Sequence, residues 1–258
     1  MTAAVRQTWQ INLRYVRAFV RQPAWVAIAL VQPVIWLLLF GALFKRVVEI
    51  PGFQGGSYIE FLTPGVVVMT AMTSAGWNGM GFVEDMRRGV LDRVLVSPVW
   101  RGALNAGSLF YAIVTIALQV LIIIGIALAA GASFENGVGG VAILVLVACL
   151  LAGSVAALSN ALALVAKQRE TLIAAVTFVT LPLTFLSSTF MQENLVPGWV
   201  RSIARFNPVN WAVEAGRSAA TQQTDWSLVG SRIGLLTALL LASATLATTA
   251  FRAYQRSI

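Results

Sequence analysis

Few side chains in this protein have the chemistry of a catalyst. The 258 residues contain no His, which excludes His-based metal sites and the Ser-His and Cys-His pairs of nucleophilic catalysis. The single Cys149 lies in an apolar run, so the chain has no internal disulfide framework. Neither Lys45 nor Lys167 ends a G-x-x-x-x-G-K-[ST] phosphate loop. We therefore expect no catalytic residues, no metal site and no cofactor in this chain, and any use of ATP must come from another polypeptide.

One segment between positions 83 and 104 combines apolar and charged residues in a helical pattern. Met86, Val90 and Val94 recur every four residues with arginines between them, which predicts a short amphipathic helix ended by Ser97-Pro98. Two carboxylates at its start would suit the positive end of the helix dipole. The alternative is a loop that only anchors at lipid headgroups. The charged and apolar residues that we single out in this segment are Glu84, Asp85, Met86, Arg87, Arg88, Leu91, Asp92 and Arg93.

Four amides lie inside apolar segments, where hydrocarbon penalises polar groups unless they face protein or water. They are Gln32, Asn78, Gln119 and Asn160. Each is a candidate for the substrate pathway, and each could instead form hydrogen bonds that hold helices together. The apolar segments contain no central charge, which argues against proton or ion coupling.

The composition indicates that the chain is a membrane protein, so its candidate functional residues are positioned by membrane-spanning segments. Apolar residues make up 58% of the chain and charged residues only 11%, with a mean hydropathy of +0.80. Six segments approach the length of about 20 apolar residues that spans a bilayer. We therefore expect an all-α integral membrane protein, one domain over residues 24–258. Its expected spans are residues 24–44, 61–82, 105–130, 141–166, 171–191 and 228–250.

Two further segments are amphipathic. Residues 1–23 place Trp9 and aliphatic residues on one helical face and arginines on the next, which predicts a cytoplasmic helix at the membrane interface. Residues 192–227 contain Pro197, Pro208 and several tryptophans, which predicts short helices that re-enter the outer interface. An ordinary amphipathic loop is the alternative for this second segment.

The basic residues predict the orientation of the chain. If the N-terminus is inside, the cytoplasmic pieces hold twelve of the 18 Lys and Arg residues and the outer pieces hold six. This asymmetry favours cytoplasmic positions for both termini. The net charge of +8 comes from residues that lie between apolar spans rather than on one soluble face, so we expect headgroup contacts and no nucleic-acid partner.

The order of these elements resembles the permease subunit of type-2 ABC exporters, closest to the daunorubicin-type drug and lipid efflux permeases. Three stretches carry the resemblance, which covers nearly the whole chain. The first is YIEFLTPG at 58–65, and the second runs from Glu84-Asp85 through RGVLDR to Ser97-Pro98. The third combines FLSS at 185–188, PGW at 197–199, FNP at 206–208 and a closing Arg217. Met191-Gln192 departs from the aromatic-Pro pair of many members, which leaves the substrate subfamily open.

The resemblance implies an exporter in a bacterial cytoplasmic (inner) membrane, built as a permease dimer on two cytoplasmic ATPase subunits that bind ATP and Mg²⁺. The second permease copy would be identical or a sister subunit. Residues 83–104 would form the coupling helix on the ATPase. The expected substrate is a hydrophobic, amphipathic drug-like molecule or a lipid, with polysaccharide or glycolipid export as the alternative. Two rivals from other classes are a stand-alone channel or secondary transporter, and a membrane enzyme such as a lipid transferase, for which only Glu84-Asp85 would qualify as surface carboxylates.

Overall fold

The computed structural model describes residues 23–49, 57–89, 102–192 and 195–255. The expected interfacial helix of residues 1–23 lies outside this part of the chain except for its last residue. Every regular element in the described residues is a helix. A helix satisfies its own backbone hydrogen bonds, which is required of a chain surrounded by hydrocarbon.

The first apolar segment is an interrupted helix. α2 (Pro23–Ile35) contains Pro33 and is followed by a π-helical turn, Trp36–Phe40, and by α3 (Gly41–Leu43). Proline provides no N–H for the helical ladder, and a π-helical turn is a common adjustment within an α-helix. A 3-10 turn, Lys45–Glu49, follows.

The second segment is a long helix in three parts. α4 (Tyr58–Gly76) begins at a capping box in which Ser57 and Glu60 bond to each other's backbone N–H groups. A 3-10 turn, Trp77–Gly79, joins α4 to α5 (Met80–Arg87). The helical chain is therefore continuous from the Ser57 cap to Arg87, and its helix type changes at Trp77–Gly79.

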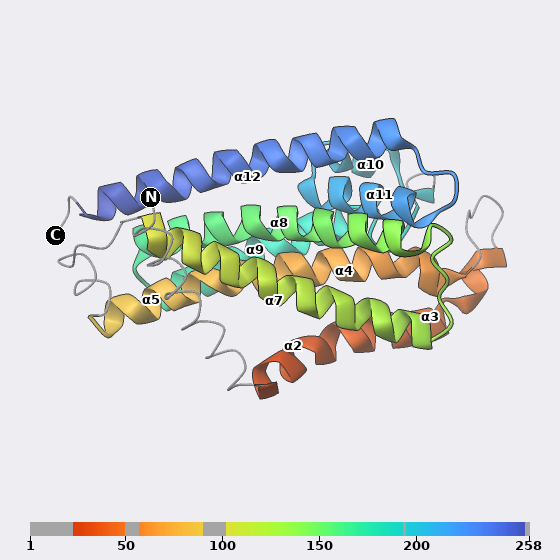
Figure 1. The fold of residues 1–258 in the computed structure, drawn as a ribbon, viewed down its shortest axis with the longest axis horizontal. Coiled ribbons are helices and arrows are strands. Elements are labelled where there is room, and N and C mark those ends of the chain that lie inside the picture. Colours follow the sequence, from red (N-terminus) through yellow and green to blue (C-terminus); the bar gives the residue numbers. More distant parts are fainter. Residues whose placement is uncertain (1–22, 50–56, 90–101, 193–194, 256–258) are drawn as a thin grey trace.

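The remaining helices are α7 (Gly102–Ala129), α8 (Gly137–Ala166), α9 (Arg169–Phe185), the short α10 (Gly198–Ala204) and α11 (Pro208–Ala220), and α12 (Trp226–Gln255). Of these, α7, α8, α9 and α12 run along the long axis of the molecule, whereas α10 and α11 lie at one end (Figure 1). Pro197 directly precedes α10, and Pro208 is the first residue of α11. The prediction of short helices at these two prolines is confirmed.

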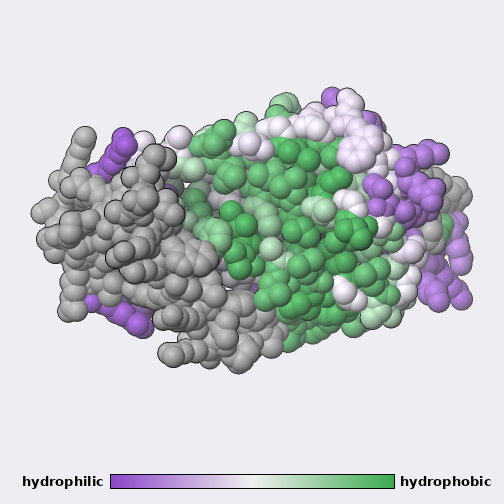
Figure 2. Space-filling model, viewed as in Figure 1, coloured by the Kyte–Doolittle hydropathy of each residue, from purple (hydrophilic) through white to green (hydrophobic). Residues whose placement is uncertain are grey.

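Four helical stretches in the described residues are long and apolar enough to cross a membrane. They are Tyr58–Arg87, Asn105–Ala129, Gly137–Ala166 and Trp226–Tyr254. Ile28–Leu43 is a shorter apolar helix, and α9 has 17 residues and ends at Phe185, before the expected limit at 191. Figure 2 shows a broad hydrophobic band across the visible face, bordered by hydrophilic residues. The chain is thus an all-helical, multi-pass membrane protein.

α8 lies at the centre of the bundle and packs against α4, α7, α11 and α12. Its buried face is rich in small residues, including Gly140, Ala148 and Ala152. A Cβ at Gly140 would lie 2.5 Å from the carbonyl oxygen of Ala219, so α11 approaches the backbone of α8 directly. Small residues allow this close approach where no hydrophobic effect drives helices together in lipid.

The two ends of the bundle differ in what they contain. At one end lie α5 and the last turns of α8 and α12, joined through a buried cluster of Phe82, Ala163, Leu172 and Phe251 and their neighbours. At the other end lie α10 and α11, with the turn between α7 and α8 (Figure 1). The described candidate partner-binding residues, 84–88, and the segment 195–227 are therefore at opposite ends.

Candidate functional site

The charged segment predicted to contact a partner begins at the end of α5. Glu84, Asp85, Met86 and Arg87 form the last turn of this helix, and Arg88 follows as its C-cap. Gly89 has φ +63°, and its N–H donates to the carbonyl oxygen of Met86 at 3.1 Å. This left-handed termination favours glycine.

The predicted helix start at Glu84 is therefore wrong. The two carboxylates lie in the last turn of α5, which is the negative end of the helix dipole. The helix that contains them begins at Met80 and directly follows α4 and the 3-10 turn. The Arg88 guanidinium Nε lies 2.6 Å from Glu84 Oε1 and offsets this charge. Leu91, Asp92 and Arg93 lie outside the described residues.

The end of α5 has two chemically distinct faces. Met86 is half-buried and packs against the cluster that contains Phe82 and Leu172. Arg87 and Arg88 are exposed, and the Arg88–Glu84 pair is exposed on both sides, at 69% and 45% of the side-chain area. An exposed ion pair stabilises a fold by no more than about 1 kcal/mol. The basic groups are therefore available to a partner at little cost to the fold.

Asn78 and Asn160 are brought together in the interior. Asn78 Nδ2 donates to Asn160 Oδ1 at 2.9 Å and to the Ser108 hydroxyl at 2.7 Å. Asn160 Nδ2 donates in turn to Asn105 Oδ1 at 3.1 Å. Asn160 is fully buried. These bonds join the 3-10 turn after α4 to α7 and α8, as expected of amides that hold helices together.

The other two amides do not join this network. Gln119 lies on α7, is 3% exposed, and its Oε1 has no hydrogen-bond partner among the described residues. Gln32 is exposed on α2 and lines a groove that α4 and α9 complete. The four predicted pathway residues therefore occupy three different places.

The groove beside Gln32 has a volume of about 170 Å³. The groove is lined by no charged residue, and its wall contains both aromatic rings and threonine hydroxyl groups. Thr184 is 4% exposed, and its hydroxyl has no partner in the part of the chain that the structure describes. The lining residues are Gln32, Trp36, Met69, Thr73, Trp77, Val176, Thr177, Thr180, Leu181, Thr184, Phe185 and Phe190.

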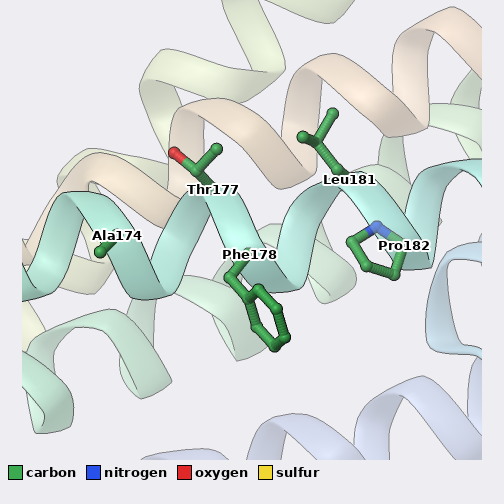
Figure 3. Close-up of a pocket in the computed structure, with 5 residues that line it drawn as sticks. All are labelled: Ala174, Thr177, Phe178, Leu181 and Pro182. Carbon is green, nitrogen blue, oxygen red and sulfur yellow. The ribbon is translucent and has the colours of Figure 1, made fainter.

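α9 supplies one wall of this groove. Figure 3 shows that Thr177 and Leu181 point toward α4, whereas Phe178 points the opposite way. A shallow depression of about 500 Å³ on α9 is lined by Ala174, Thr177, Phe178, Leu181 and Pro182, so it shares Thr177 and Leu181 with the groove. The threonines of the groove were not among the predicted pathway residues, although Thr177, Thr180 and Thr184 recur at helical spacing along one face of α9.

The chain after α9 is held by Asn207, which caps two helices. Asn207 Nδ2 donates to the carbonyl oxygens of Leu183 and Leu186 at 2.6 and 2.9 Å, where α9 leaves its last carbonyls without partners. Asn207 Oδ1 accepts from the N–H of Val209 at 2.9 Å, at the start of α11. The FNP motif therefore fixes α11 against the end of α9.

A buried polar network extends this connection to α4 and α12. Asn210 accepts from the N–H of Ser188 at 2.8 Å and donates to Glu214 at 2.7 Å. Glu214 Oε2 lies 2.7 Å from Arg232 Nε on α12, with the two side chains 16% and 23% exposed. Arg217 donates to the carbonyl oxygens of Ser188 and Phe61 and lies 3.7 Å from the centre of the Phe61 ring.

Comparison with known proteins agrees with this architecture. Residues 6–220 match the family described as ABC-2 type transporter. A putative transport permease, ycf38, of Porphyra purpurea is 30% identical over 83% of this chain and 73% of its own length. The daunorubicin resistance ABC transporter permease protein DrrB1 of Streptomyces coeruleorubidus is 29% identical, over 84% and 74%. The inner membrane transport permease YadH of Escherichia coli K12 is 26% identical, over 93% and 91%.

Proposed function

The chain belongs to the ABC-2 type transporter family and is a membrane permease of that kind, and from this premise we propose that it exports an amphipathic, drug-like or lipid substrate. Export is driven by a separate ATPase subunit, present in two copies, which binds ATP and Mg²⁺. A second permease copy, identical or a sister subunit, completes the pathway. The exposed basic residues at the end of α5 support a contact with an acidic surface of the ATPase.

The proposed topology has six spans with both termini in the cytoplasm. Besides the four long helices, α2 with its π-helical turn and α9 would each cross most of the bilayer, and α10 and α11 would re-enter it from outside. The excess of basic residues over the whole sequence, twelve against six, supports a cytoplasmic position for the end that holds α5.

Single-cysteine labelling tests this orientation. In a Cys149→Ser background, Val138→Cys should react with a membrane-impermeant maleimide from outside, because Val138 is 85% exposed at the outer turn. Gln168→Cys, in the exposed turn between α8 and α9, should react only after the membrane is permeabilised. The reverse pattern would place α5 outside and remove its contact with a cytoplasmic ATPase.

The uncharged groove beside α9 is the observation that carries the proposed substrate class. Four aromatic side chains, Trp36, Trp77, Phe185 and Phe190, offer flat apolar surface, and the threonines and Gln32 offer a few hydrogen bonds. Sites for small amphipathic molecules combine a largely apolar lining with few polar groups. A polysaccharide would require many more amide or carboxylate partners than Gln32 provides, so this alternative is less favoured.

Filling the groove should block transport. Thr180→Trp places a large ring in the groove and should lower efflux roughly tenfold or more, which corresponds to a loss of about 1.4 kcal/mol or more in substrate binding. Val179→Trp is the matched control, because Val179 is the neighbouring residue on α9, is 50% exposed and does not line the groove. Efflux is followed by daunorubicin fluorescence in vesicles energised with ATP. Equal losses in both variants would contradict the groove as the pathway.

A further inference from the structure

The buried polar side chains between α4 and α5 lie between two separate hydrophobic clusters. The larger cluster contains Ala75 of α4 and Ala156 of α8, and the smaller one contains Phe82 of α5 and Ala163 of α8. Between them lie the 3-10 turn Trp77–Gly79 and the side chains that hold it. We define this polar layer as Asn78, Asn105, Ser108, Ser159 and Asn160.

The 3-10 turn is fixed to the backbone of α8. The N–H of Gly79 donates to the Ser159 hydroxyl at 3.0 Å, and that hydroxyl donates to the carbonyl oxygen of Gly76. A Cβ at Gly79 would overlap the carbonyl oxygen of Ser159, so the two backbones are in contact. Ser159 therefore bonds to the chain on both sides of the change in helix type.

The polar layer also lies between the two functional parts of this helix. On its inner side, α5 ends in the exposed Arg87 and in Met86. On its outer side, Thr73 and Trp77 form a wall of the groove, and Trp77 is adjacent to Asn78 in the chain. A stretch of 3-10 helix within a longer helix often marks a functional hinge.

We infer that Ser159 and Asn160 are positioning residues that transmit movement of α5 to the groove wall of α4. Because the hydrophobic clusters on either side are separate, the polar layer supplies the side-chain hydrogen bonds at the junction between α4 and α5. The polar layer holds the 3-10 turn Trp77–Gly79 to α7 and α8. When α5 is displaced, α4 therefore rotates about this turn, and the helix does not bend between α4 and α5. The hydrogen bonds of the polar layer hold the 3-10 turn in one geometry, because leaving a buried polar group unpaired costs free energy of folding.

This inference rests on the proposed function, because an ATPase must supply the movement. The test uses the complete complex with its co-purified ATPase, in a Cys149→Ser background, with two pairs of spin labels. One pair, at Gly81 and Val165, reports on α5 against α8, because Gly81 is exposed on α5 and lies outside the proposed ATPase contact. The other pair, at Thr73 and Thr177, reports on the groove. Addition of Mg-ATP and vanadate should change the dipolar broadening of both pairs in the otherwise unaltered complex.

In Ser159→Ala and in Asn160→Leu, the pair at α5 should still respond and the groove pair should not. Ser159→Thr keeps a hydroxyl and should restore the groove response. Ser154→Ala is the matched control, since Ser154 is buried on α8 but bonds only to Leu150 of its own helix among the contacts of the described residues, and it should leave both responses intact.

The possible failures are distinguishable. A groove pair that still responds in Ser159→Ala and Asn160→Leu would overturn the inference alone. An unaltered complex in which neither pair responds to nucleotide would contradict the proposed function as well. If Ser159→Ala does not assemble, Asn160→Leu and Asn78→Leu test the same polar layer, because each removes the bond between Asn78 and Asn160.

Discussion

Reversing Arg87 and Arg88 to Glu should abolish ATP-driven transport while the permease still inserts into the membrane at its normal level. Both side chains are exposed at the end of α5, so their replacement leaves the spans and the buried clusters intact. Like charges placed across an interface cost several kcal/mol, which corresponds to a loss of ATPase affinity of roughly a hundredfold or more. Loss of the exposed Arg88–Glu84 pair contributes little to this effect.

The measurement is co-purification of the ATPase, followed by transport in proteoliposomes. Lys45→Glu with Arg46→Glu is the matched control, because these two adjacent basic residues are also exposed and lie in the 3-10 turn before α4, remote from α5. We expect the control to bind the ATPase normally. Full ATPase binding by the Arg87 and Arg88 double variant would show that α5 only contacts lipid headgroups.

The sequence predicted most of the helices because hydropathy and proline act locally. The expected segments at 105–130 and 141–166 differ from α7 and α8 by at most four residues at either end. The prolines at 197 and 208 correctly marked the short helices α10 and α11. The start of a coupling helix at Glu84 was wrong, because the acidic pair resembles a helix start and nothing local shows that α5 continues a preceding span.

The candidate site depended on contacts between distant residues, which one sequence does not reveal. Asn78 and Asn160 are recognisable in the sequence as polar residues within apolar segments, but their hydrogen bond joins positions 82 residues apart. The groove combines residues from α2, α4 and α9, and only Gln32 among them was predicted. Threonine gives a weak signal in a membrane helix because its hydroxyl can bond to its own backbone, as Thr70 and Thr73 do in α4.

The largest expected loss of stability concerns Glu214 and Arg232. Arg232→Met should lower the free energy of unfolding by about 3 kcal/mol, because it leaves the Glu214 carboxylate mostly buried without its counter-ion. Asn210 still donates to Glu214 at 2.7 Å, but a neutral amide does not replace a guanidinium. The predicted effect appears as a lower melting temperature of the detergent-solubilised protein, followed by size-exclusion chromatography after heating.

The double variant Glu214→Gln with Arg232→Met separates the pair from the packing around it. Replacing both partners of a buried ion pair is often close to neutral, whereas removing one is not, so the double variant should recover most of the lost stability. Glu84→Gln is the control for an exposed pair and should cost less than about 1 kcal/mol. If the double variant melts as low as Arg232→Met alone, the loss comes from altered packing between α11 and α12, and the ion pair does not hold the outer helices in place.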